Sequence, residues 1–381
     1  MISRNDNNFN YYSTAIIGAG CSGLSLAYQL TKDKKNNLII LDPHKLRKDH
    51  IWAFWDNGKD YLKTARSLAI KKWDKWSIKT NIGNITLSGD EYKYTALSSV
   101  KFENYLREKI SREGSKFQKG YVTKIRDEKN KKLIFLENDK EILANNVFDT
   151  RPPTILQGGM YQHFIGWNIE TDYPIFEPNN VTLMDFRVDQ SKGIHFIYVL
   201  PFSTKKALIE STVFSTTLLP DEWYEKQIKN YMISNFSNAK WVIKSKENGI
   251  IPLTNLKKNK PMGISIGMNA NAMRASSGYA FAQIQKQIKE LSKLKDTLSQ
   301  IIKVRPGASY FEQFMDKVFL NVLKNNPKNA PEIFMRVFDS LTGDEFAKFM
   351  NGYSPLSTKI KIIKSQEKRI FLHAALKSIF T

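Results

Sequence analysis

One acidic residue lies within a strongly apolar stretch of the chain. Residues 207–214 predict a β-strand, in which Glu210 has Leu208, Ile209 and Val213 as close neighbours. An apolar environment raises the pKa of a carboxyl group, which then stays protonated near neutral pH and is suited to general acid catalysis. The same pattern also fits a glutamate on the solvent-exposed face of a half-exposed strand, and the residues alone leave both interpretations open.

A glycine-rich turn near the N-terminus is typical of a phosphate-binding loop. Gly18, Gly20 and Gly23 form a G-x-G-x-x-G pattern between an apolar run and a helical pattern. Gly18 permits the tight turn, Gly20 lets the backbone approach a pyrophosphate, and Gly23 lets the helix pack closely on the strand. The helix N-terminus offers free N–H groups to the phosphates. Asp42, about 20 residues further on, is placed to bind the adenosine ribose hydroxyls.

The glycine pattern is shared by FAD-binding and NAD-binding proteins, and it also occurs in turns that bind no ligand. In FAD proteins this strand–helix–strand unit lies close to the N-terminus and a later segment returns to the cofactor. Both features are present here, so we expect FAD. Cys21 is the single cysteine, and the five histidines show no metal-ligand spacing, so no metal site is expected.

The elements that must position these residues follow from the apolar periodicity. Strands at 13–17 and 38–41 with a helix at 24–30 between them predict a βαβ unit with parallel strands. The aromatic stretch 50–56 (HIWAFWD) is interpreted as a connection. The pattern then predicts a helix at 102–110, a hairpin at 121–136 and a strand at 147–149. This strand ends at Arg151-Pro152-Pro153.

The pattern changes from about residue 158 onward. Long antiparallel strands are expected, followed by a helix, at 181–188, 194–200, 207–214 and 221–233. A buried strand at 264–267 and a helix at 281–294 are expected to rejoin the first domain. The remainder is helical: apolar residues share one face over 311–323, and Thr342 to Glu345 form a capping box. That apolar face fits either core packing or a bilayer interface.

These elements predict an α/β fold with three parts. A Rossmann-type FAD-binding domain spans residues 10–155, with 263–298 returning to it. An antiparallel β-sheet substrate domain spans 156–262, and a C-terminal helical part spans 299–381. The oligomeric state does not follow from the sequence.

The charge of the chain is unusual, with 58 basic against 37 acidic residues and a net charge of +21. An anionic membrane surface or nucleic acid would account for it, and so would the codon bias of an AT-rich genome. Most of the basic residues are lysines and no nucleic-acid motif accompanies them, so no nucleic-acid partner is expected. The first 12 residues resemble no signal peptide and no apolar run reaches about 18 residues, so we expect a cytoplasmic protein at the inner face of the membrane.

Seven stretches in a fixed order carry a resemblance that covers about the whole chain. The chain resembles the lycopene cyclase family, in particular its short bacterial members, within the flavoprotein superfamily of p-hydroxybenzoate hydroxylase-like folds. The stretches are HIWAFWD at 50–56, FDTRPP at 148–153, QHFIGWNIET at 162–171, TLMDFRV at 182–188, YVLPFSTKKALIESTVFS at 198–215, ENGIIPL at 247–253 and SSGYAF at 276–281.

The resemblance implies roles for individual residues. The proposed catalytic acid of the family matches Glu210, and Ser211 stands where plant-type cyclases carry a second acid, so a single acid is implied. Arg151 matches the flavin-contacting segment. Gly267, Ser277 and Gly278 match the segment in which the backbone approaches the flavin ring, although the chain has Ala275 at a proline-like position and no acid at 267–269.

The reaction implied by the resemblance is the cyclisation of the linear ends of lycopene to β-ionone rings. An acid protonates the terminal double bond, the carbocation closes a six-membered ring, and loss of a proton ends the reaction. The flavin is expected in its reduced form, with NAD(P)H as the reductant, and the carotenoid substrate requires access to a membrane surface. Two alternatives remain: a redox flavoenzyme such as a hydroxylase or isoprenoid reductase, and a non-catalytic basic protein that binds membrane or nucleic acid.

Overall fold

The N-terminal residues form the predicted strand–helix–strand unit. The computed structural model describes residues 10–43, 47–152, 159–253, 262–293 and 304–379. β1 (Asn10–Ile17) and β2 (Leu38–Asp42) pair in parallel, and α1 (Cys21–Leu30) connects them. Alternate residues of both strands enter two separate hydrophobic clusters, so both faces of this sheet are buried. This explains why both strands are continuous apolar runs in the sequence.

The first sheet extends this unit on both sides. Its strand order is β8-β2-β1-β11-β10-β9, with β8, β2, β1 and β11 mutually parallel. The predicted hairpin is confirmed as β9 and β10, and the predicted helix as α3, which packs with α1. The added elements are α3 (Ser99–Arg112), β8 (Lys116–Lys119), β9 (Val122–Glu128), β10 (Lys131–Leu136) and β11 (Glu141–Asp149).

A later segment returns to this sheet. β17 (Ile264–Ser265) pairs in parallel with the end of β11, and α5 (Phe281–Leu291) packs against α1. The strand expected at 264–267 is wrong in its second half, because Gly267 has a φ of +69° and begins the short helix η3 (Gly267–Ala270). The expected end points Pro153 and Leu294 lie outside the described residues.

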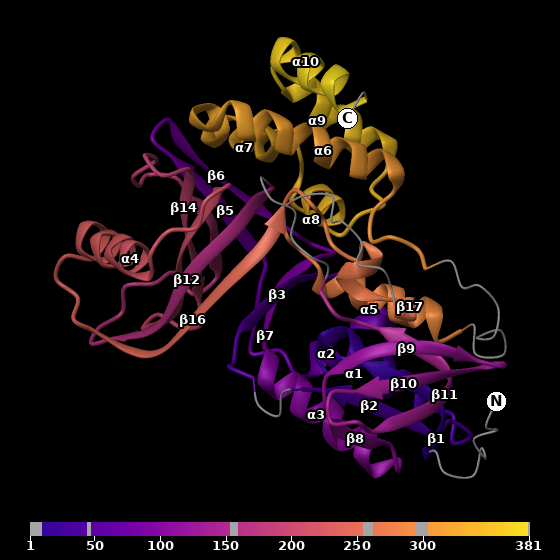
Figure 1. The fold of residues 1–381 in the computed structure, drawn as a ribbon. Helices are drawn as coiled ribbons and strands as arrows, with labels where there is room; N and C mark the ends of the chain where they lie inside the picture. The colour runs from indigo at the N-terminus through magenta and orange to yellow at the C-terminus, as the bar shows by residue number, and fades with distance from the viewer. Residues whose placement is uncertain (1–9, 44–46, 153–158, 254–261, 294–303, 380–381) are drawn as a thin grey trace.

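A second, largely antiparallel sheet lies beside the first (Figure 1). Its strand order is β16-β12-β15-β14-β13-β5-β6, and α4 (Asp221–Asn235) covers one of its faces. Strands β5 and β6 of this sheet come from the N-terminal part of the chain. The division of the chain into domains near residue 155 stays a prediction. The strands are β5 (Lys75–Thr80), β6 (Gly83–Ser88), β12 (Met160–Thr171), β13 (Asn180–Asp185), β14 (Ile194–Pro201), β15 (Lys206–Ser215) and β16 (Trp241–Leu253).

The aromatic stretch 50–56 corrects one expectation. Instead of a connection it forms β3 (Ile51–Asp56), which pairs with β7 (Lys93–Ser98) in a small sheet that also contains β4 (Lys71–Trp73). Neighbouring residues Phe54 and Trp55 are both buried, one in each of two core clusters. Because both faces of β3 are covered, its sequence lacks the alternation that marks a half-exposed strand. Two short helices follow it, η2 (Asp60–Leu62) and α2 (Lys63–Ser67).

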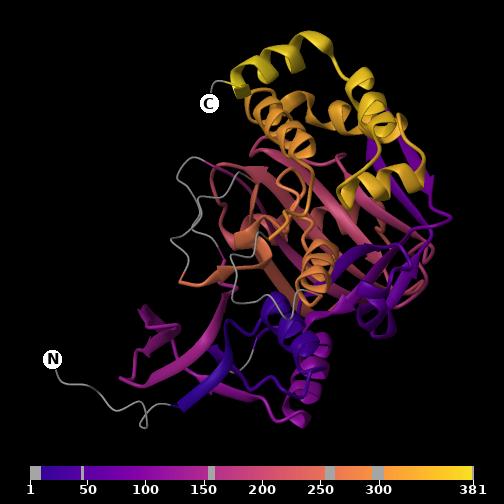
Figure 2. The ribbon, with the colours of Figure 1, turned by 90° about the vertical axis from the view of Figure 1, so that its right-hand side faces the viewer.

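The C-terminal part is helical, as predicted, and lies at the end of the molecule farthest from the first sheet (Figure 2). The predicted capping box at Thr342 and Glu345 begins α8. Within the described part of the chain, no helix is both long and apolar enough to cross a bilayer. The helices are α6 (Tyr310–Asn325), η5 (Pro327–Asn329), α7 (Ala330–Asp339), α8 (Gly343–Met350), α9 (Leu356–Ser365) and α10 (Lys368–Ile379).

Candidate active site

The glycine loop joins β1 to α1 with the geometry that its sequence predicts. Gly18 has a φ of +97°, which favours glycine, and a Cβ on Gly23 would lie 1.9 Å from the carbonyl oxygen of Gly18. Asp42 ends β2 beside this loop, and its Oδ2 accepts a hydrogen bond of 2.6 Å from the backbone N–H of Ala19. The structure therefore brings Gly18, Gly23 and Asp42 together.

Two arginines flank the same loop, and sequence reasoning missed both. The Arg47 guanidinium lies in front of Gly20, where a Cβ would be 3.0 Å from its Nη1, and its Nη2 donates to Asp42 over 2.8 Å. Arg107 of α3 donates from Nη2 to the carbonyl oxygen of Ala19. Their spacing in the sequence follows no recognisable pattern. They add positive charge at a helix N-terminus, where anions bind favourably.

The returning segment meets the N-terminus of α1. A Cβ on Gly267 would lie 2.2 Å from Oγ of Ser22, so only a glycine permits this close approach. Further along, Gly278 also has a positive φ, of +71°, and the buried Oγ of Ser277 has no hydrogen-bond partner among the described residues. The predicted residues Gly267, Ser277 and Gly278 thus lie on one segment that connects the glycine loop with the second sheet.

Arg151 makes no contact with these residues among the interactions of the described chain. It follows the end of β11, and its Nε and Nη2 donate to the carboxylate of Asp149 over 2.9 and 2.7 Å. The Asp149 carboxylate raises the pKa of the guanidinium, which is one side of a two-residue ion pair. Arg151 does not line the cavity described next, and its expected contact with a flavin stays a prediction.

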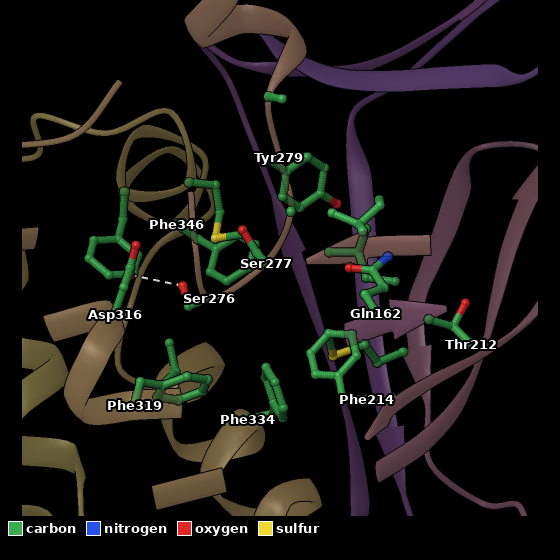
Figure 3. A pocket seen from close by; sticks show the side chains of 18 of the residues that line it. Gln162, Thr212, Phe214, Ser276, Ser277, Tyr279, Asp316, Phe319, Phe334 and Phe346 are labelled. Atoms are coloured by element: carbon green, nitrogen blue, oxygen red, sulfur yellow. Dashed lines mark hydrogen bonds between the residues drawn. The ribbon is translucent and has the colours of Figure 1, made fainter. Parts of the chain in front are cut away.

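A cavity of about 930 Å³ runs between the two sheets and the C-terminal helices. Cys21, the first residue of α1, lines one end, and Leu372 of α10 lines the other. Between these ends the walls are mostly apolar and aromatic, and Figure 3 shows rings from a strand of the second sheet and three helices facing the space: Phe214, Phe319, Phe334 and Phe346. The volume and apolar lining are typical of a small-molecule site. The cavity thus connects the glycine loop with the helical part.

The wall formed by the second sheet carries Glu210. Its side chain points into the cavity together with Thr212 and Phe214, which are two and four residues further along β15. Ile209 and Val213 face the α4 side instead, so most of the apolar surroundings of Glu210 come from other elements. The residue is 7% exposed, and burial raises the pKa of its carboxyl group well above the ordinary value of 4.5. The predicted burial is therefore confirmed, and the solvent-exposed alternative is wrong.

A second carboxyl group stands beside Glu210, although the sequence implied a single acid. Glu247 of β16 and Glu210 of β15 are both cross-strand partners of Gly166 on β12, the strand between them. Glu247 is 6% exposed and lines the same cavity. Burial raises the pKa of Glu247, and the charge of Glu247 in turn raises that of Glu210. The stretch 247–253 was part of the family resemblance, but nothing in it paired Glu247 with Glu210.

Ser211, the position of the second acid in plant-type cyclases, lies on the other face of the sheet. Its Oγ contacts Nε2 of His195 at 3.0 Å, and neither residue lines the cavity. Adjacent residues of a strand point to opposite faces, so an acid at position 211 would not stand beside Glu210 in this fold. Burial lowers the pKa of His195 to about 4, which leaves its ring neutral.

Three tyrosines form a hydrogen-bonded cluster next to the carboxyl pair. Tyr94 Oη lies 2.8 Å from Tyr198 Oη and 2.7 Å from Tyr279 Oη, and Tyr198 is the cross-strand partner of Glu210. Burial raises the pKa of all three hydroxyls, so they stay protonated. Trp55 packs on Tyr94 with ring centroids 4.3 Å apart. The part of the cavity around Glu210 is therefore rich in aromatic rings, whose π faces attract cations.

The arrangement fits a dinucleotide cofactor that reaches from the glycine loop toward this cluster. Gly20 has no side chain at the helix N-terminus, where an added Cβ would lie 3.0 Å from Nη1 of Arg47, and Gly23 lets α1 pack against the carbonyl group of Gly18. The buried Oε1 of Gln162 and Oγ of Ser277 both line the cavity and lack partners within the described ranges, as Figure 3 lets the reader follow. Across those same ranges, no group of three or more His, Cys, Asp or Glu side chains is arranged to hold a metal ion.

Solved structures share this architecture over nearly the whole chain. A geranylgeranyl bacteriochlorophyll reductase-like protein from Thermoplasma acidophilum matches with a TM-score of 0.63 and 11% identity, covering 96% of this chain and 99% of that one. A flavin-dependent brominase also has a TM-score of 0.63, at 13% identity, covering 97% and 99%. The fold is therefore that of the FAD-binding flavoproteins, a Rossmann-type domain with a second sheet and a C-terminal helical part, as predicted.

Sequence comparison then gives the family. The lycopene cyclase protein family matches residues 14–378, and the chain belongs to it. The lycopene beta-cyclase of Pantoea ananas is 23% identical over an alignment of 395 residues, gaps included, that covers 97% of this chain and 98% of that protein. The predicted resemblance is confirmed, and membership supports an enzyme of carotenoid cyclisation.

Proposed function

We propose that this protein is a lycopene beta-cyclase, an intramolecular lyase that converts the linear ends of lycopene to β-ionone rings without net redox change. The observation that carries the proposal is the position of Glu210, a buried carboxyl group with a raised pKa on the wall of an apolar cavity. Protonation of an alkene requires an acid that is neutral and shielded from water, and Glu210 meets both conditions. Glu210 is accordingly the proton donor to the terminal double bond.

The cavity supports a carotenoid substrate. A polyene offers no groups for hydrogen bonding, and the cavity walls formed by β15 and the C-terminal helices are lined with phenylalanines, among them Phe214, Phe319 and Phe334. After protonation the substrate carries a positive charge near Glu210. The rings of Tyr94, Tyr198 and Tyr279 surround that end of the cavity and stabilise a cation through their π faces.

FAD is the proposed cofactor, in its reduced form and with NAD(P)H as the reductant. Gly18, Gly20 and Gly23 would hold the pyrophosphate at the N-terminus of α1, Asp42 the adenosine ribose, and the backbone around Gly267, Ser277 and Gly278 the ring system. Arg151 would contact the flavin from the end of β11. When bound, reduced flavin supplies an electron-rich ring that stabilises positive charge in the cavity.

We further propose that the protein binds peripherally to the inner face of a membrane through α9 and α10. Leu372 and Leu376 are 63% and 59% exposed on α10, and Ile363 is exposed on α9. Lys364 and Lys368 line the same end of the cavity as Leu372. Exposed apolar residues beside lysines are typical of helices that lie in an anionic membrane interface. The cavity would then open toward the bilayer that holds the substrate.

The test is expression in a host that accumulates lycopene, followed by pigment analysis. We expect cyclic carotenoid with β-ionone rings, and flavin in the purified protein. Unchanged lycopene would contradict the cyclase proposal. Consumption of NAD(P)H in proportion to product would indicate a redox flavoenzyme instead, and a purified protein without flavin or activity would indicate a non-catalytic basic protein.

A further inference from the structure

Glu247 is a buried carboxyl group that the proposed function leaves without a role. It lies across Gly166 from Glu210, and a Cβ added to Gly166 would be 2.9 Å from Cγ of Glu210 and 3.2 Å from Cγ of Glu247. The missing side chain of Gly166 is thus what allows the two carboxyl groups to extend side by side over the same cavity. Two carboxyl groups this close in an apolar setting do not both ionise, so the pair holds at least one proton near neutral pH.

The hydrogen bonds around the pair are unequal. The backbone N–H of Ile51 at the start of β3 points at both carboxylate oxygens of Glu247, at 3.2 and 3.4 Å. The described residues supply no comparable hydrogen-bond donor to Glu210. Burial and the charge of Glu247 raise the pKa of its carboxyl group. A hydrogen bond from an N–H group favours the ionised form of its acceptor. Glu247, whose pKa burial raises to about 8, is therefore the first of the two to ionise, and Glu210 keeps its proton.

We propose that Glu247 is the base that accepts the proton lost at the end of cyclisation. This inference rests on the proposed cyclase function. Glu210 gives its proton to the terminal double bond, the resulting cation forms the ring-closing carbon–carbon bond with the next double bond, and the positive charge moves to a ring carbon. A proton then leaves the neighbouring ring carbon for Glu247 as the ring double bond forms. Transfer of this proton within the pair restores Glu210, so one proton enters and one leaves.

Other titratable groups around the pair must be separated from it in any test. Tyr94, Tyr198 and Tyr279 face it from three elements, and their raised pKa values keep them protonated. Asp49 raises the pKa of Glu247 by its charge and accepts hydrogen bonds from Ser98 and Ser99. His50 has its Nε2 3.2 Å from the carbonyl oxygen of Asn248, next to Glu247. His50 is therefore replaced separately in the second measurement.

The first measurement is the ring type and rate of Glu247→Gln on lycopene in vesicles, with FAD-loaded full-length protein. We expect cyclisation to fall by about 10²-fold or more, and the remaining product to contain ring double bonds formed by proton loss at other carbons. Glu247→Asp keeps a carboxyl group and should restore the wild-type ring type at a reduced rate. Glu170→Gln, the same change at an ion-paired surface position of β12, is the matched control.

The second measurement is the pH profile of turnover. The wild type should lose activity as the pH falls below about 8, where Glu247 takes up a proton, and at high pH, where Glu210 ionises as well. Glu247→Gln should lack the low-pH decline, whereas His50→Gln should retain it. Wild-type ring type together with an unchanged low-pH decline in Glu247→Gln would overturn the assignment and leave Glu247 a structural acceptor for Ile51. Failure of the wild type to cyclise lycopene would instead overturn the underlying function.

Discussion

Replacement of Glu210 by glutamine separates its chemical role from its structural cost. Glutamine keeps the size of the side chain and cannot donate a proton to an alkene. General acid catalysis contributes about 10²- to 10⁴-fold to a rate, and we expect Glu210→Gln to lose at least that factor in cyclisation. Water does not substitute readily for the acid, because the residue is buried among aromatic side chains.

The same replacement lowers activity but should raise the stability of the protein relative to the wild type as the pH increases. The raised pKa of Glu210 means that the folded protein retains a proton that the unfolded chain releases above about pH 4.5. The wild type therefore loses stability as the pH rises from that value toward the folded-state pKa, by about 1.4 kcal/mol per pH unit for one proton. Glutamine does not titrate. The stability of Glu210→Gln relative to the wild type should thus increase by roughly 2–3 kcal/mol between pH 5 and pH 7.

Two assays check these expectations. Pigment analysis in a lycopene-accumulating host measures cyclisation, and urea unfolding at pH 5, 6 and 7 measures stability, with Glu170→Gln as the control that should match the wild type in both. Near-wild-type cyclisation by Glu210→Gln would refute its role as the donor. A stability difference that does not change with pH would show that Glu210 is not protonated in the folded protein, and the reasoning from its burial would fail.

Two further predictions concern the cofactor and the membrane. Gly20→Val should release flavin, because its side chain would occupy the approach to the loop beside Arg47, where a Cβ already lies 3.0 Å from Nη1; a normal flavin absorption spectrum in the purified variant would contradict this. The double change Leu372→Glu and Leu376→Glu should abolish flotation of the protein with anionic liposomes at low salt. The control Ile82→Glu changes an exposed apolar residue on the β5–β6 turn and should float like the wild type. Equal flotation of the wild type and both variants would argue against α10 as the binding surface.

Local patterns in the sequence predicted much of the fold. The glycine spacing with its flanking apolar runs specified β1, α1 and β2, because backbone conformation and close packing there depend on residue types a few positions apart. The same holds for the capping box that begins α8. The pattern failed at β3, since a strand covered on both faces shows no alternation.

The candidate site divides in the same way. The sequence singled out Glu210 and the glycines, and the order of its motifs gave the family. It paired Glu210 with no second acid, because the chain neighbour that was considered, Ser211, points to the opposite face of the strand. Glu247 stands beside Glu210 through pairing of β15, β12 and β16, whose register is set by contacts between residues far apart in the chain. Only the tertiary structure decides which residues of different strands share a face and a cavity, because that depends on long-range packing.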